Sequence, residues 1–152
     1  MLNFLKQKAK PYFNIEEQKL ITEAIKEAEH ATSGEVRVYI EANCKYLNAL
    51  DRAKEVFFML QMDETLQHNG VLIYLAFKDK QFAIFGDTNI YNKMGKLAFE
   101  NQAANFKLYL IKNLFVEGFC TTINLMGIAL KQFFPNDNKD KNELPDEIVF
   151  GN

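Results

Sequence analysis

The hydrophobic pattern of the chain centres on residues 71–77, an unbroken run of β-favouring residues. The run is too short for a buried helix and lacks helical spacing, so it predicts a central strand covered on both faces. A polar triplet, Lys78 to Lys80, separates it from a second apolar run at residues 82–85, which stops at Gly86. This order predicts a β-hairpin with antiparallel strands.

Upstream of the hairpin, the pattern predicts a helix, a strand and a second helix. Asn14 and Glu17 have the spacing of a capping box, and apolar residues then recur every three or four positions over residues 20–31, which indicates a helix. Residues 35–41 alternate between apolar and polar, so we expect a strand covered on one face and lying near an edge of the sheet. Residues 50–62 again have helical spacing.

A strand, a helix and a following strand form a β-α-β unit, whose two strands run parallel with a right-handed crossover. The hairpin then makes the third strand antiparallel to the second. These directions bring residues 34–35, 68–70 and 86–87 to the same end of the sheet.

Two further helices are expected in the second half of the chain. One includes Ile90 to Ala98 and is capped by a residue of the segment 87–89. The other carries apolar residues at helical spacing over residues 111–133 and is closed by Pro135. The pattern therefore predicts a three-layer α/β/α sandwich, in which about four helices flank a small mixed sheet.

We expect three parts along the chain: an N-terminal extension over residues 1–12, one domain over residues 13–135, and a C-terminal tail over residues 136–152. The tail begins with a polar, mixed-charge linker and ends in three apolar residues, 148–150. A disordered terminus has no physical need for apolar residues, so we expect the tail to dock on the domain.

Composition narrows the range of partners. The chain has 152 residues, 48% of them hydrophobic, which suits one domain with its own core. Its net charge of −2 provides no positive field, so nucleic acid is not an expected partner. No stretch is apolar enough for stable membrane insertion or for a signal peptide, and two cysteines do not make a disulfide framework. We therefore expect a cytoplasmic monomer that works with a protein partner yet to be identified.

Most signatures of catalysis are absent from the sequence. Neither cysteine is followed, six residues on, by the arginine that a cysteine-type phosphatase needs, and no phosphate loop or histidine metal motif occurs. What remains is oxygen-ligand chemistry at the shared end of the sheet. The candidate ligands of a divalent cation, calcium or alternatively magnesium, come from several chain segments: Glu35, Asn69 and Asp87, with Asp63, Glu143 and Asp146 as additions.

Simpler roles remain open for the three main candidate ligands. Glu35 could be an exposed strand start, Asn69 a turn residue and Asp87 a helix cap. His68 is a candidate proton carrier, or else a surface loop residue. Asp79 is expected to be a hairpin-turn residue at the opposite end of the sheet.

The ordered set of motifs resembles the TPM domain family. The resemblance is carried by residues 29–38, 69–76, 82–87, 134–135 and 142–148, and it covers most of the chain from about residue 13 onward. It implies an α/β/α sandwich, a calcium site in some members and a proposed acid phosphatase activity in a plant thylakoid-lumen member. Other members resemble accessory modules of membrane proteins.

The chain departs from this family pattern in two places. Many relatives have Asp-Asp where this chain has His68-Asn69, and many carry a signal peptide and a membrane anchor. Two hypotheses follow for function. The first is a cation-binding domain that acts through a protein partner, and the alternative is a metal-assisted phosphomonoesterase with His68 as proton carrier.

Overall fold

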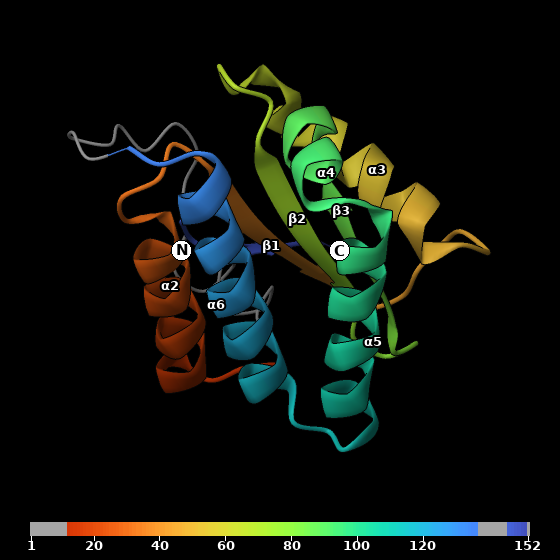
Figure 1. Ribbon diagram of the computed structural model, residues 1–152. Helices are drawn as coiled ribbons and strands as arrows, with labels where there is room; N and C mark the ends of the chain where they lie inside the picture. The colour runs from red at the N-terminus through yellow and green to blue at the C-terminus, as the bar shows by residue number, and fades with distance from the viewer. Residues whose placement is uncertain (1–11, 137–145, 152) are drawn as a thin grey trace, which may run out of the picture.

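The computed structural model describes residues 12–136 and 146–151, in which a four-stranded sheet lies between two layers of helices (Figure 1). The elements are α2 (Ile15–Glu29), β1 (Glu35–Glu41), α3 (Ala49–Met59), the 3₁₀ helix η1 (Met62–Glu64), β2 (Gly70–Ala76), β3 (Gln81–Gly86), α4 (Thr88–Met94), α5 (Lys96–Ile111), α6 (Phe115–Phe133) and β4 (Val149–Phe150). The α/β/α sandwich expected from the sequence is confirmed. The described residues contain five α-helices, where about four were expected.

The strands lie in the order β3-β2-β1-β4. β1 runs parallel to β2, whereas β2 and β3 pair antiparallel, which confirms the β-α-β unit followed by a hairpin. As expected, β1 lies near an edge of the sheet, next to the edge strand β4. β4, from the end of the chain, pairs with β1 at Tyr39 and Ile40, so β1 has a neighbour on each side.

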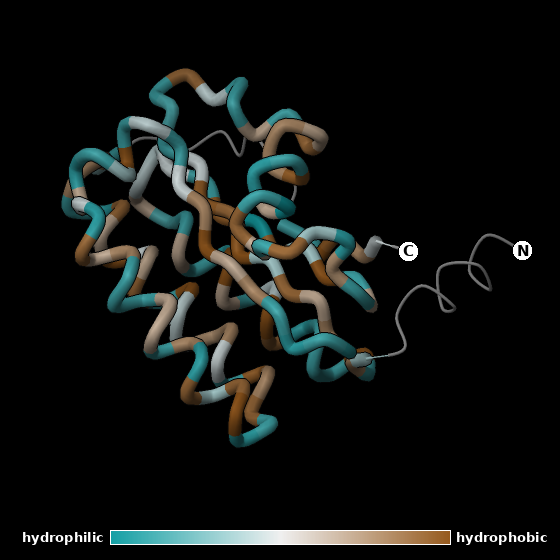
Figure 2. Tube along the Cα trace, turned by 90° about the vertical axis from the view of Figure 1, so that its right-hand side faces the viewer, coloured by the Kyte–Doolittle hydropathy of each residue, from teal (hydrophilic) through white to brown (hydrophobic). Residues whose placement is uncertain are grey.

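Two hydrophobic cores lie on opposite faces of the sheet. One face packs against α2, α5 and α6, which stand side by side in Figure 1, and the other packs against α3. In Figure 2 the strands in the middle are largely brown, whereas the helices alternate between teal and brown along their length. No helix within residues 12–136 and 146–151 is long and apolar enough to cross a membrane.

Local sequence explains where these helices begin and end. The capping box expected at α2 is present, since Asn14 accepts a hydrogen bond from the Glu17 amide and Glu17 accepts one from the Asn14 amide. The third helix of the sequence pattern is divided into α4 and α5 at Gly95, whose φ of +93° favours glycine. The fourth begins at Phe115 rather than at Ile111, because residues 112–114 form a turn.

The close packing of α2 against α6 depends on Gly127. A Cβ atom at this position would lie 2.7 Å from the Cα and Cβ atoms of Ala28. Thr32 fixes the C-terminal end of α6, because its hydroxyl donates to the carbonyl oxygens of Leu130 and Phe134. The segment that enters β1 is therefore anchored to α6.

The polar residues of β1 are buried, which corrects the expectation of a half-covered strand. Glu41 is only 2% exposed, and both of its carboxylate oxygens accept hydrogen bonds from the Arg52 guanidinium at 2.9 Å. The Tyr74 hydroxyl also donates to Glu41. The hydrogen bond to Glu41 is the main reason that the pKa of Arg52 is raised, so the guanidinium keeps its charge.

Candidate functional site

Three loops meet at one end of the sheet, as the strand directions require. Glu35 lies opposite Gly70, and Val71 lies opposite Gly86. The backbone amide of Asp87 donates to the Gly70 carbonyl oxygen at 2.9 Å. The entry to β1, the entry to β2 and the exit from β3 are therefore neighbours. The sequence predicted this juxtaposition.

His68 and Asp87 form a pair at the β3 side of this end. The His68 Nδ1 atom lies 3.4 Å from the Asp87 Oδ2 atom, and the imidazole side chain is 53% exposed. Asp87 Oδ1 accepts a hydrogen bond from the Thr88 amide and caps α4, which is the simpler role foreseen for this residue. His68 has a φ of +50°, an uncommon conformation for a residue with a side chain. The fold therefore holds a solvent-accessible imidazole beside a nearly buried carboxylate.

Asn69 carries an unpaired polar atom in the middle of the site. Its side chain is fully buried, and its Nδ2 atom donates to the Ser33 hydroxyl at 3.1 Å. Its Oδ1 atom has no hydrogen-bond partner among the described residues. An unpaired buried acceptor costs about 1–3 kcal/mol, so such groups call for an explanation. A cation or a proton donor would satisfy this oxygen.

An acidic cluster lies at the β1 side of the same end. Glu29 is 9% exposed and accepts a hydrogen bond from the Val36 amide at 2.8 Å. Burial raises the pKa of Glu29 well above its ordinary range, and the hydrogen bond to Asp146 and the charge of Glu35 act in the same direction. This shift favours the protonated form of Glu29, which can donate to Asp146.

Arg37 is the positive member of this cluster. It is 7% exposed, and its Nε atom has no hydrogen-bond partner among the described residues. Burial lowers the pKa of Arg37, whereas the charges of Glu29, Glu35 and Asp146 oppose that shift. The cluster thus combines one arginine with three acidic groups, one of them contributed by the tail.

Sequence reasoning missed Glu29 and Arg37. Glu29 was not among the candidate residues, although it follows Ile21 and Ile25 at steps of four and so shares their buried stripe. That spacing was the available signal. The sequence offered no such signal for Arg37, because a polar residue at an alternate position of a strand is also what an exposed residue looks like.

The remaining predicted residues lie elsewhere. Asp63 is half-buried in η1, and no side-chain hydrogen bond or ion pair is found for it within the described segments. Glu143 lies outside the described residues. Asp79, at the opposite end of the sheet, accepts hydrogen bonds from the Cys44 amide and the Asn43 side chain, which lower its pKa.

Four of the five expected ligands that the structure describes fall into two groups. Asn69 and Asp87 lie at the β2 and β3 side, whereas Glu35 and Asp146 lie in the acidic cluster. In the part of the chain that the structure describes, no group of three or more His, Cys, Asp or Glu residues is arranged to hold a metal ion. Among the described candidate ligands, Asn69 contributes a buried oxygen that is left unpaired and so is available to a cation.

Comparisons with known proteins agree with this fold. A family model described as the TPM domain matches residues 9–127. The NMR structure of the BA42 protein from the psychrophilic bacterium Bizionia argentinensis is similar to this chain with a TM-score of 0.85 and 37% identity, covering 93% of this chain and 97% of that one. No match to a curated protein was found.

A more distant structure shares the fold alone. The N-terminal domain of the cg2496 protein from Corynebacterium glutamicum has a TM-score of 0.63 at 10% identity, and the match covers 86% of this chain and 79% of that domain.

Proposed function

The chain belongs to the TPM domain family, and from that premise we propose that it is a divalent-cation-binding domain of calcium type that acts through a protein partner. The observation that carries the proposal is the buried, unpaired Oδ1 atom of Asn69. Asp87 and the acidic cluster, on either side of it, give this end of the sheet a surplus of oxygen donors. Hard cations such as calcium prefer carboxylate, amide and carbonyl oxygens.

The donor set also predicts how strongly a cation binds. Calcium takes six to eight oxygen ligands, and an amide oxygen carries no full charge. Because no carboxylate cage is preformed among the described residues, we expect weak binding, with a dissociation constant in the range of about 10⁻⁴ to 10⁻³ M. Asn69 and Asp87 would hold the cation, and the cation would order the loops that carry them.

A titration with calcium, and separately with magnesium, tests the proposal. Amide resonances of residues 33, 69 and 87 should shift with metal, and the melting temperature should rise with the metal concentration.

Asn69→Asp adds a charge at the unpaired oxygen and should tighten binding several-fold, whereas Asp87→Asn should weaken binding while keeping a good helix cap. Asp51→Asn, at an exposed position in the first turn of α3, is the matched control. The proposal fails if the metals move neither the resonances nor the melting temperature at about ten times the expected dissociation constant.

The pairing of His68 with Asp87 favours a second candidate, a metal-assisted phosphomonoesterase. The exposed imidazole can exchange protons with solvent, and Asp87 orients it through Nδ1. A bound cation would supply polarisation of a phosphoryl oxygen. Turnover of an aryl phosphate by purified protein tests this candidate. Activity that His68→Ala and Asp87→Asn leave unchanged would belong to another site or to a contaminant.

A further inference from the structure

The outer edge of β3 presents unpaired backbone groups. β3 is the last strand of the sheet and pairs with β2 alone. The Asp87 amide donates to the Gly70 carbonyl, so these two residues form a hydrogen-bonded pair. Backbone groups alternate along an antiparallel ladder, and the N–H and C=O groups of Phe82, Ile84 and Gly86 therefore point away from β2. Within the described segments, no hydrogen-bond partner is found for them.

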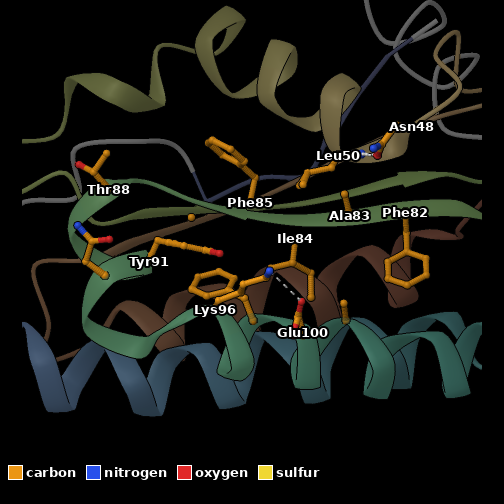
Figure 3. A pocket seen from close by; sticks show the side chains of 14 residues that line it. Asn48, Leu50, Phe82, Ala83, Ile84, Phe85, Thr88, Tyr91, Lys96 and Glu100 are labelled. Carbon is orange, nitrogen blue, oxygen red and sulfur yellow. Dashed lines mark hydrogen bonds and ion pairs between the residues drawn. The ribbon is translucent and has the colours of Figure 1, made fainter.

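A groove of about 580 Å³ runs along this edge. Figure 3 looks onto it: β3 crosses the view, the start of α3 lies above it, and α4 and α5 lie below. Phe85 and Leu50 lie on the α3 side, and Ile84 and Tyr91 lie on the α5 side. The volume is that of a typical ligand site, and the walls are largely apolar.

The walls of the groove select the kind of occupant. The charged residues lining it are Lys96 and Glu100, whose Nζ and Oε2 atoms lie 4.0 Å apart, so the groove carries no net charge. A second copy of the chain would present an edge recessed between the same helices, and two recessed edges cannot approach to the roughly 4.8 Å that strand pairing needs. A single extended segment can enter. A small apolar ligand would leave the backbone groups of the edge unpaired.

We propose that this groove binds an extended, uncharged peptide segment of a partner protein, which adds to the sheet as a strand beside β3. Backbone hydrogen bonds to Phe82 and Ile84 hold the segment. Its side chains alternate between the α3 wall and the α5 wall, and apolar residues suit both. The span from Phe82 to Gly86 accommodates about five residues, or roughly 17 Å. The groove adjoins the candidate cation site at Gly86 and Thr88, but this inference does not depend on a bound cation.

The probe is the tightest-binding peptide selected from a displayed library of random decapeptides against the full chain. Bound peptide should protect the Phe82 and Ile84 amides from hydrogen exchange and shift their resonances. N-methylating alternate amides of the peptide separates backbone pairing from mere apolar contact. One alternating set should weaken binding by about tenfold or more and the other by less than about twofold, because only one set faces β3.

Two matched pairs of variants locate the site. Ala103 lines the groove on α5, whereas its neighbour Ala104 is exposed outside it, so Ala103→Arg should weaken peptide binding about tenfold and Ala104→Arg should not. Leu50, which is 48% exposed, lines the opposite wall, and Leu47 is fully exposed outside it. Leu50→Arg and Leu47→Arg therefore repeat the comparison if Ala103→Arg does not fold.

Four outcomes would overturn the proposal. The first is that the library yields no binder. The second is that the selected peptides shift resonances away from β3, and the third is that both N-methylated sets bind equally. This third result would make the groove a site for apolar ligands without strand addition. The fourth is unchanged binding by Ala103→Arg and Leu50→Arg, which would place the site elsewhere.

Discussion

The carboxyl group of Glu29, at the end of α2, shares a hydrogen bond with the carboxylate of Asp146 from the C-terminal tail. Two acidic groups can share a hydrogen bond only if one of them holds a proton. Burial assigns that proton to Glu29, whose pKa is raised, while Asp146 is more exposed. The contact between the tail and the domain is therefore linked to protonation.

The first prediction is that stability falls as the pH rises. The folded chain holds the Glu29 proton more tightly than the unfolded chain, so stabilisation is complete below the unfolded pKa of about 4.3 and is lost as the pH rises toward the folded pKa. Urea unfolding from about pH 5 to pH 9 should show this decline.

Glu29→Gln should reduce that decline by more than about 1 kcal/mol. Glutamine stays neutral, accepts from the Val36 amide and donates to Asp146, so the contacts of the protonated side chain are kept. Glu23→Gln, at an exposed position of α2, should leave the pH dependence unchanged. Parallel pH profiles for the natural chain and Glu29→Gln would contradict the assignment of the proton.

The second prediction concerns the buried ion pair between α3 and β1. Arg52→Leu should lower the free energy of unfolding by about 3 kcal/mol or more, because it leaves the Glu41 carboxylate buried without its partner. Adding Glu41→Gln should recover part of this loss, since a neutral amide is less costly to bury. Lys54→Leu, at an exposed position of the same helix, is the control. Chemical denaturation measures all three, and an equal loss in Lys54→Leu would point to helix effects instead.

The sequence predicted the strands well because their signals are local. The apolar run of β2, the polar triplet of the hairpin and the alternation in β1 each lie within a few residues. The environment of β1 was mispredicted because its partners are distant in sequence. Glu41 pairs with Arg52 from α3, and Arg37 lies near Asp146 from the tail. Periodicity cannot distinguish a buried charge that has a partner from an exposed one.

The helix α5 was only partly predicted for a different reason. Phe99 and Phe106 are buried on one side of it, whereas Leu97, Leu108 and Ile111 are more than half exposed on the other. Apolar residues therefore surround the helix, and no single stripe marks its buried face. The sequence predicted that the loops at the strand ends meet, and so it predicted where in the fold the candidate site lies. Its division into an Asn69–Asp87 part and an acidic cluster depends on side-chain directions that spacing does not give.

The third prediction tests the contact between α2 and α6. Gly127→Ala places a methyl group 2.7 Å from Ala28, so the two helices must separate, and the free energy of unfolding should fall by about 1–3 kcal/mol. Alanine favours helices intrinsically, so a rise in stability would show that the helices separate at little cost. Ala28→Gly in the same chain removes part of the clash and should restore some stability relative to Gly127→Ala. Thermal unfolding of the three chains gives the comparison.

The last prediction isolates β4 from the acidic cluster that precedes it. A chain that ends at Glu147 keeps Asp146 but loses Ile148, Val149 and Phe150, together with the hydrogen bond from the Gly151 amide to the Ile40 carbonyl. The three apolar side chains are half-buried, so together they contribute about 2 kcal/mol before the cost of ordering the tail. The melting temperature should therefore fall by about 4 °C or more. A chain that ends at Gly151 keeps β4 and should melt like the natural chain. If the shorter chain also melts unchanged, β4 contributes nothing to stability, and the edge of β1 is available to another strand.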